Sequence, residues 1–306
     1  MHDDLAYLAS PALSGRLAGT PGNDSAATFI AHRYFDLGLA GAYGGASCGL
    51  ERCDSSYFQM FQLSPQTVTA LDVVVSDITQ NVGAIVRGTD SSLKSQFVIV
   101  GAHYDHIGRS NTYALDRIRS YRPGLHPGAD DNASGTVAVL ELARRFAEHP
   151  SRRSVLFANF GAEELGLIGS KAFVRNSPVP IDAIVAMINL DMVGRLRDDR
   201  LNLYVGEASE RFHVVVDSVE HIPPALNFHF DWLPSWRGAS DQISFSRAHV
   251  PVLGLFTDYH PDYHRSSDVV DRIDFPGLEK VVDFAERLVR AVADGNDRPS
   301  HVSKIP

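Results

Sequence analysis

The sequence has few of the features that mark several common protein classes. It has only two cysteines in 306 residues, and neither has a histidine near it at the spacing of zinc ligands. No apolar stretch is long enough to span a bilayer. The 28 lysines and arginines are outnumbered by 37 aspartates and glutamates, and they form no basic cluster. We therefore expect no zinc site built on cysteines, no membrane span and no nucleic-acid partner.

The two cysteines, Cys48 and Cys53, lie close together in a loop rich in glycine and serine. A disulfide within this loop is favoured and indicates an oxidising compartment, and free thiols in a cytosolic protein are the alternative. The first ten residues lack the charged and apolar regions of a signal peptide, but a mature or trimmed chain would lack them too. We expect an extracellular or periplasmic location.

What the sequence does contain is the composition of an ordinary globular protein, with 44% hydrophobic and 21% charged residues. Its length allows a sizeable core, and it has no internal repeat, low-complexity tract or convincing linker. We expect one catalytic domain over residues 1–306.

Strand-like and helix-like patterns alternate along most of the chain. The strand patterns cover residues 57–63, 71–78, 81–86, 97–102, 154–160, 183–190, 201–205 and 252–257. The helix patterns cover 23–37, 133–147, 165–175, 207–220 and 241–247, and a last amphipathic helix carries apolar residues from 278 to 292. An irregular loop with tryptophan and proline precedes the 241–247 helix. The first three strands are expected to be antiparallel. The later alternation predicts an α/β fold, a three-layer α/β/α sandwich around a mixed, largely parallel sheet.

Reactive side chains follow the predicted strands at the points where the strands end. They are His103 and Asp105, Glu163 and Glu164, Asp191, and His260, Asp262 and His264, while Asp130, Asp131 and Asn132 stand just before a helix. Ligands bind outside the carboxyl ends of the strands in open α/β sheets, so these groups should converge on one edge. Singly, each has an ordinary explanation as a core histidine, a helix cap or a turn residue. Together, so many carboxylates would repel one another unless divalent cations neutralised them. Histidines mixed with carboxylates suit zinc in a hydrolytic site.

The segment from Phe157 to Ser170, FANFGAEELGLIGS, is the centre of this pattern. An apolar strand ends in a glycine, and two adjacent glutamates, Glu163 and Glu164, follow it. Neighbouring carboxylates at the end of a buried strand are unfavourable unless they are protonated, paired or bound to metal. One glutamate would then bind a metal while the other moves protons. The alternative is a solvated helix N-terminus, where the helix dipole favours acidic residues.

Five ordered motifs resemble those of the co-catalytic di-zinc aminopeptidases, the relatives of aminopeptidase Y, bacterial leucyl aminopeptidases and glutamate carboxypeptidase II. The motifs are HYDH (103–106), GADDNASG (128–135), AEELGLIGS (162–170), NLDMVG (189–194) and DYHRSSD (262–268). The N-terminal LASPALSGRLAGTPGN is also similar to the opening of bacterial members. The resemblance implies a fold of the zinc-dependent exopeptidase type and two zinc ions per chain, or other divalent first-row ions. It also implies peptides with a free N-terminus as substrates.

The resemblance assigns a role to each matching residue. Asp130 would bridge the two ions, His103 and Asp191 would complete the shell of one ion, and Glu164 and His264 that of the other. Glu163 would be the general base, Tyr263 a hydrogen-bond donor to the oxyanion, and Asp105 the residue that orients His103. The bridging aspartate of the family precedes a cis peptide, which here would be Asp130–Asp131.

The implied function is that of a metallo-aminopeptidase, which hydrolyses the N-terminal peptide bond through a metal-bridged water and a glutamate base. A lid-domain carboxypeptidase or deacylase has a similar order of ligands, but residues 191–264 are too few for its extra domain. A single-zinc enzyme like glutaminyl cyclase is a second alternative. A non-catalytic peptide-binding relative is the third, although the complete ligand set argues against it.

One departure from the family pattern is Gln242, because many relatives carry histidine at that position. It bears on contacts around the ions or the substrate and not on the ligands themselves. The Trp232–Trp236 loop and Phe245 are candidates for a specificity pocket, with ordinary packing as the alternative.

Overall fold

The computed structural model describes residues 1–44, 55–69, 71, 74–109, 124–206, 210–234, 237, 240–296 and 298. Cys48 and Cys53 lie outside these ranges, so their disulfide stays a prediction. No helix among the described residues is long and apolar enough to cross a membrane.

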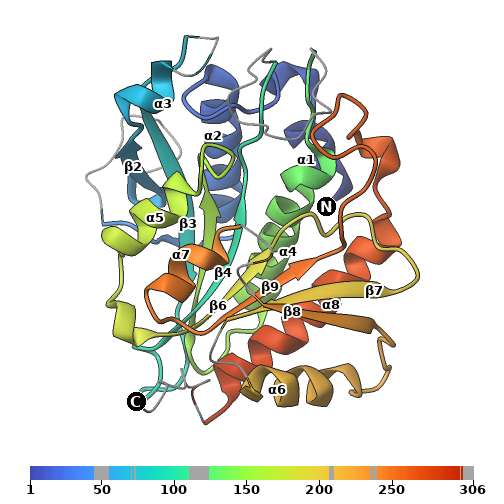
Figure 1. Cartoon of the computed structure of the whole chain (residues 1–306). Coiled ribbons are helices and arrows are strands. Elements are labelled where there is room, and N and C mark those ends of the chain that lie inside the picture. Colours follow the sequence, from blue (N-terminus) through green and yellow to red (C-terminus); the bar gives the residue numbers. More distant parts are fainter. Residues whose placement is uncertain are drawn as a thin grey trace, which may run out of the picture.

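The described strands form one nine-stranded sheet with the order β1-β3-β5-β4-β6-β9-β7-β8, and β2 pairs with β3 beside this path (Figure 1). Their bounds are β1 (Ala40–Gly41), β2 (Phe58–Gln62), β3 (Ile78–Val86), β4 (Phe97–His103), β5 (Ser154–Phe160), β6 (Ile184–Leu190), β7 (Arg200–Val205), β8 (His229–Pro234) and β9 (Val252–Phe256). β4 runs parallel to β5 and β6, and β6 runs parallel to β9. β1, β2 and β5 are antiparallel to β3, while β7 is antiparallel to β9 and parallel to β8. The sheet is therefore mixed with a parallel centre, which confirms the prediction.

Helices cover both faces of this sheet. Their bounds are α1 (His2–Leu8), α2 (Pro21–Asp36), α3 (Pro65–Thr69), α4 (Gly135–Glu148), α5 (Ile168–Arg175), α6 (Glu210–Glu220), α7 (Gln242–Arg247) and α8 (Phe275–Asp294). Short 3₁₀ turns lie at Pro11–Leu13, Ser55–Tyr57, Ile181–Ala183 and Val270–Arg272, and an irregular helical turn, Ala129–Ser134, precedes α4.

The apolar side chains of β4 alternate between two cores, one on each face. Val98 and Val100 belong to the larger core, to which α2, α4, α6 and α8 contribute. Ile99 points the other way and belongs to a second core with Phe173 of α5 and Phe245 of α7. All residues of β4, β5, β6 and β9 are buried, which explains their continuous apolar sequences. These layers form the predicted three-layer sandwich.

Several parts of the fold differ from the expectation. The irregular loop expected after α6 contains β8, which pairs with β7 along its whole length and packs Phe230 and Trp232 against the larger core. The strand expected over 71–78 is wrong for residues 74–77. There the backbone forms hydrogen bonds with loops instead of a neighbouring strand. For example, the backbone N–H of Ser76 donates to the carbonyl of Gly19 at 2.8 Å. Helices α1 and α3 and the short strand β1 have no counterpart among the predicted elements.

Candidate active site

The structure brings the reactive side chains together at one edge of the sheet, outside the carboxyl ends of its parallel strands. His103 is the last residue of β4, and Asp191 directly follows β6. Glu163 and Glu164 lie three and four residues beyond β5, and His264 lies in the loop after β9. Because β4, β5, β6 and β9 are parallel, all these ends meet at the same edge.

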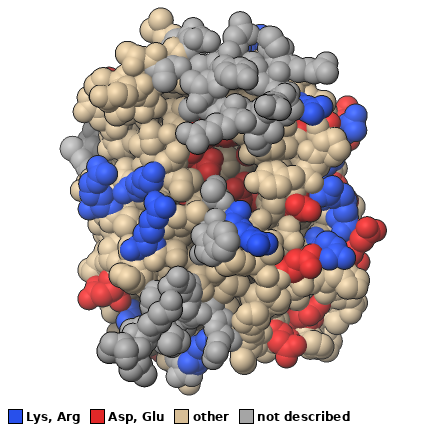
Figure 2. Space-filling model, viewed as in Figure 1, with Lys and Arg blue, Asp and Glu red and all other residues tan. Residues whose placement is uncertain are grey.

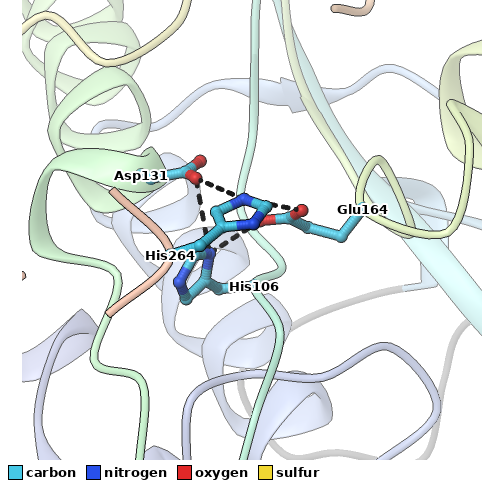
Figure 3. A group of neighbouring side chains, drawn as sticks. All are labelled: His106, Asp131, Glu164 and His264. Atoms are coloured by element: carbon cyan, nitrogen blue, oxygen red, sulfur yellow. Dashed lines mark hydrogen bonds and ion pairs between the residues drawn. The ribbon is translucent and has the colours of Figure 1, made fainter. Parts of the chain in front are cut away.

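One group of possible metal ligands consists of His106, Asp131, Glu164 and His264 (Figure 3), whose donor atoms all lie within 4.8 Å of one another. His264 Nε2 is 3.1 Å from Asp131 Oδ2 and 3.2 Å from Glu164 Oε2. His106 Nδ1 is 2.7 Å from Glu164 Oε1. The sequence-based assignment did not include His106, although the second histidine of HYDH follows the same strand as His103.

A second group consists of His103, Asp131 and Asp191. His103 Nε2 is 3.4 Å from Asp131 Oδ1 and 3.4 Å from Asp191 Oδ1. Asp131 therefore belongs to both groups and uses a different oxygen toward each. This is the geometry required of a carboxylate that bridges two cations.

Asp130, to which the sequence-based prediction gave the bridging position, has other partners, and the residue that lies in both groups of possible ligands is its neighbour Asp131. The Oδ1 of Asp130 accepts the N–H of Gly194 at 2.7 Å, and the Oδ2 of Asp130 lies 3.1 Å from His260 Nε2. The cis peptide is likewise at Asp131–Asn132 and not at Asp130–Asp131. The physical reason is the turn before α4, where Asp131 and Asn132 leave helical geometry, so that the adjacent carboxylates of Asp130 and Asp131 contact different residues.

The turn that carries Asp131 is fixed from two directions. The carboxylate of Asp268 accepts the backbone N–H groups of Asp130 and Asp131 at 3.0 and 3.1 Å. The side chain of Asn132 donates to the carbonyl of Leu190 at 3.0 Å and accepts the N–H of Met192 at 3.1 Å. Because Leu190 and Met192 flank Asp191, the turn and the loop after β6 hold each other in place.

Asp105 positions the two glutamates. Its carboxylate oxygens accept the backbone N–H groups of Glu163 at 3.0 Å and of Glu164 at 3.3 Å. Its closest carboxylate approach to His103 Nδ1 is 3.7 Å, whereas the backbone carbonyl of Asp105 lies 3.2 Å from that nitrogen. The hydrogen-bond partner of His103 is thus the main chain of Asp105, and the side chain holds the glutamate pair.

The two adjacent glutamates have opposite pKa directions. Burial raises the pKa of Glu163 well above its ordinary value, and the neighbouring charge of Glu164 adds to this against the opposing effect of His103. Burial would raise the pKa of Glu164 as well, but the charge and hydrogen bond of His264 and the hydrogen bond of His106 together outweigh it, and the pKa falls to about 2. Glu164 therefore keeps its charge, whereas Glu163 can take up a proton.

The donor set suits a divalent first-row cation. It combines imidazole nitrogens with carboxylate oxygens and contains no thiolate among the described residues. Asp191 Oδ1 is buried and makes no hydrogen bond within the described residues, although it faces His103. Such an orphaned acceptor beside an imidazole is satisfied when a cation lies between them.

A pocket opens beside these two groups. Its polar lining includes His103, Glu163, Glu164 and Asp191, and its apolar and aromatic lining includes Met192, Tyr204, Phe256, Tyr259 and Tyr263. In Figure 2, acidic side chains are visible inside a hollow of the surface, with lysines and arginines outside it. The site is thus an acidic recess with an aromatic wall.

The aromatic residues named from the sequence have different surroundings. Phe245 is fully buried and packs against Phe160 and Phe173 in the second core. The ring centre of Trp232 lies 3.6 Å from that of His213, with the two rings tilted, and Trp236 lies outside the described residues. For Phe245, ordinary packing is the correct interpretation. Gln242 does line the pocket, where its Oε1 accepts a hydrogen bond from Asn189 at 3.0 Å.

Comparisons with known proteins relate the sequence of this chain to a family. A model of the family described as peptidase family M28 matches residues 81–289. Aminopeptidase YwaD of Bacillus subtilis is 30% identical over 215 residues, which are 68% of this chain and 43% of that protein. The chain therefore spans less than half the length of this relative.

Solved structures share the fold. BSAP, a zinc aminopeptidase from Bacillus subtilis, superimposes with a TM-score of 0.71 at 18% identity, over 99% of this chain and 97% of that chain. Glutaminyl cyclase of Porphyromonas gingivalis superimposes with a TM-score of 0.69 at 16% identity, over 94% and 97%. The fold alone thus does not separate a peptidase from a cyclase, but the family model covers most of the sequence. The chain belongs to peptidase family M28, in agreement with the resemblance of its motifs to zinc aminopeptidases.

Proposed function

We propose that this protein is a zinc aminopeptidase that removes the N-terminal residue of peptides. The observation that carries the proposal is the position of Asp131, which is shared by two groups of possible ligands directly beside Glu163. Two divalent ions held close together are typical of aminopeptidases, and one carboxylate common to both would hold them there.

Seven residues form the proposed centre. His103 and Asp191 would hold one ion. Glu164 and His264 would hold the other ion, with His106 beside them. Asp131 would contact both ions, and Glu163 would bind neither. Bound zinc supplies a Lewis acid that polarises the scissile carbonyl and lowers the pKa of water.

Glu163 is the proposed general base. It would take a proton from the attacking water and return it to the leaving amine. Both steps need a carboxylate that can hold a proton in a buried site, and burial raises the pKa of Glu163 in that direction. The hydrogen bonds from Glu163 and Glu164 to Asp105 support the fixed relative position of base and ligand.

Tyr263 is the proposed donor to the oxyanion. It lines the pocket, and its ring stacks on the imidazole of His264 at 3.9 Å. Burial raises the pKa of its hydroxyl, so the hydroxyl keeps its proton and can donate it in a hydrogen bond. The acidic lining of the pocket favours the positively charged α-amino group of a peptide, which would limit cleavage to the chain end.

A panel of aminoacyl-anilides, tested with and without a strong chelator, measures this function directly. We expect hydrolysis that the chelator abolishes and added zinc restores. Metal counting by atomic emission adds a second readout, because two ions per chain fit the aminopeptidase and one ion fits the cyclase. Hydrolysis that strong chelators leave unchanged would contradict the proposal, and zinc-loaded protein without any hydrolysis would indicate a binding module. We propose that residues 1–306 act as one catalytic domain, and the extracellular or periplasmic location stays a prediction.

A further inference from the structure

Arg16 is a fully buried arginine behind the candidate active site, in a segment that precedes the part matched by the family model. Its Nε donates to the carbonyl of Tyr104 at 2.8 Å. One terminal nitrogen donates to the carbonyls of Leu8 and Pro127, and the other donates to the carbonyl of Gly128 at 2.9 Å. One guanidinium thus connects three separate segments of the chain.

The loop before α2 is shaped to place this side chain. Ser14, Gly15 and Arg16 all have left-handed backbone geometry, with φ of 49°, 73° and 52°. A Cβ on Gly15 would lie 2.5 Å from the carbonyl oxygen of His126, so only glycine allows the loop to approach so closely.

The main chain of Arg16 is held as firmly as its side chain. Its carbonyl accepts the N–H of His106 at 3.2 Å and the side-chain amide of Asn23 at 3.1 Å. Backbone and guanidinium therefore both contact the segment from Tyr104 to His106.

Two of the segments held by Arg16 carry some of the proposed metal ligands, His103, His106 and Asp131. Tyr104 lies between His103 and Asp105 in HYDH, and Gly128 lies three residues before Asp131. We propose that Arg16 is a positioning residue for catalysis, which fixes the distance between the His103–His106 segment and the turn that carries Asp131. This inference rests on the proposed function, because the two segments whose spacing Arg16 would fix carry proposed ligands of both ions.

The charge of Arg16 supports the same role. Within the described residues its guanidinium donates to backbone carbonyls, while the carboxylates of Asp105, Asp131 and Asp268 lie near enough to act on it through space. Burial lowers the pKa of Arg16 to about 10, against the effect of these carboxylates, so the side chain is charged at neutral pH. A lysine would keep this charge, but its compact ammonium lacks the planar fork that reaches several carbonyls at once.

Arg16→Lys separates positioning from charge, and Arg153→Lys is a matched control. Arg153 is also buried and donates to Gln96 Oε1 and to the carbonyl of Val292, both at 2.9 Å. It directly precedes β5, at the opposite end of that strand from Glu163. Both variants should lower the thermal stability, so stability alone does not test the inference.

The deciding readouts are zinc affinity, kcat and the visible spectrum of the cobalt-substituted protein, which reports the ligand geometry. We expect Arg16→Lys to weaken zinc binding by about 10–100-fold, as loss of a supporting contact does, with a shifted cobalt spectrum and a lower kcat. Arg153→Lys should leave all three unchanged. The same zinc affinity, spectrum and kcat in both variants would overturn the inference.

Failure of the proposed function and failure of the proposed role of Arg16 give different results. Wild-type protein that binds no zinc in the calorimeter would contradict the proposed function itself, whereas unaltered zinc binding in Arg16→Lys contradicts only the role of Arg16. If Arg16→Lys does not fold, Asn23→Ala takes its place, because it removes one of the two hydrogen bonds to the carbonyl of Arg16 and keeps the guanidinium. It should shift the cobalt spectrum in the same direction, and an unchanged spectrum would count against the inference.

Discussion

The carboxylates of Asp130 and Asp131 have different partners although the two residues are adjacent in the chain. Asp131 lies 3.1 Å from His264 Nε2 and 3.4 Å from His103 Nε2. Asp130 instead accepts the N–H of Gly194 and contacts His260. One carboxylate therefore joins the two groups of possible ligands, and its neighbour holds the surrounding loops together.

This difference predicts opposite results for one chemical change at neighbouring positions. Asp131→Asn should lose stoichiometric binding of both zinc ions, because an amide carries no charge to share between two cations. Asp130→Asn should keep two ions per chain and lose about 1–3 kcal/mol of stability, since it weakens buried hydrogen bonds of a charged group. Atomic emission after dialysis gives the zinc content, and thermal unfolding gives the stability. Two ions retained in Asp131→Asn would contradict its bridging role.

The sequence could predict that an aspartate of GADDNASG faces the site, but not which one. Both residues stand in the same segment before a helix, and their side chains separate only through the non-helical backbone of Asp131 and Asn132. Tertiary bonds from Asp268 and to Leu190 set that backbone, and they come from segments far away in the chain. A one-residue ambiguity of this kind disappears only when the fold is known.

The parallel strands could be predicted well because burial on both faces leaves a continuous apolar run, as in β5. Strand β8 could not, since it lies at the edge of the sheet and ends in Pro234. Its apolar residues Phe230 and Trp232 alternate with polar ones, and their partner surface exists only after β7 and α8 have packed.

Glu163→Gln should lower kcat by about 10²–10⁴-fold, the range that a positioned general base contributes. The amide has nearly the same shape and cannot take a proton, and Glu163 belongs to neither group of possible ligands. Both zinc ions should therefore remain, which atomic emission checks alongside anilide hydrolysis. Glu164→Gln is the contrasting variant, because it should lose metal as well as activity. Undiminished turnover of the zinc-loaded Glu163→Gln protein would remove Glu163 from the mechanism.

His106→Gln should weaken the binding of one zinc ion by about 10–100-fold, whether His106 binds the ion or only supports Glu164. The structure gives His106 one close partner in the site, Glu164 Oε1 at 2.7 Å, and leaves its Nε2 without a hydrogen bond among the described residues. His260→Gln is the matched control, since His260 contacts Asp130 and belongs to neither group. Competition with a chromophoric chelator measures both variants, and equal affinities would show that His106 has no part in the site.

Tyr263→Phe should lower kcat by about 10²–10³-fold, as expected when an oxyanion donor is removed, and should change KM little. Tyr259→Phe is the control, because Tyr259 lines the same pocket and its ring lies 4.8 Å from that of Tyr263. Steady-state kinetics on one anilide distinguishes the two. A similar small effect of both variants would indicate that Tyr263 is only part of the aromatic wall.

The ion pairs between α4 and α8 should make part of the stability depend on pH. Arg145 contacts Glu141 on its own helix and both Asp283 and Glu286 on α8, at 2.6–2.9 Å. Burial would raise the pKa of Glu141 and Glu286, but hydrogen bonds from neighbouring arginines outweigh it and lower both values. A carboxyl whose pKa is lower in the folded protein stabilises the fold above its unfolded value, about 4.3 for glutamate, and the contribution is lost as the pH falls through the folded value.

Arg145→Met should therefore destabilise the protein at pH 7 by about 0.5–1 kcal/mol, a small figure because these groups are partly exposed. The difference from wild type should start to shrink as the pH falls below about 4.3, the unfolded value, and should be lost as the pH passes through the lower pKa values of the two glutamates in the folded wild type. Thermal unfolding of chelator-treated protein from pH 7 to pH 3 measures it without interference from zinc. Arg287→Met serves as the control, since the guanidinium of Arg287 donates to backbone carbonyls of Ile222 and Pro224. Its destabilisation should not change with pH, and the same constancy in Arg145→Met would mean that the carboxyl groups around Arg145 contribute nothing to folding.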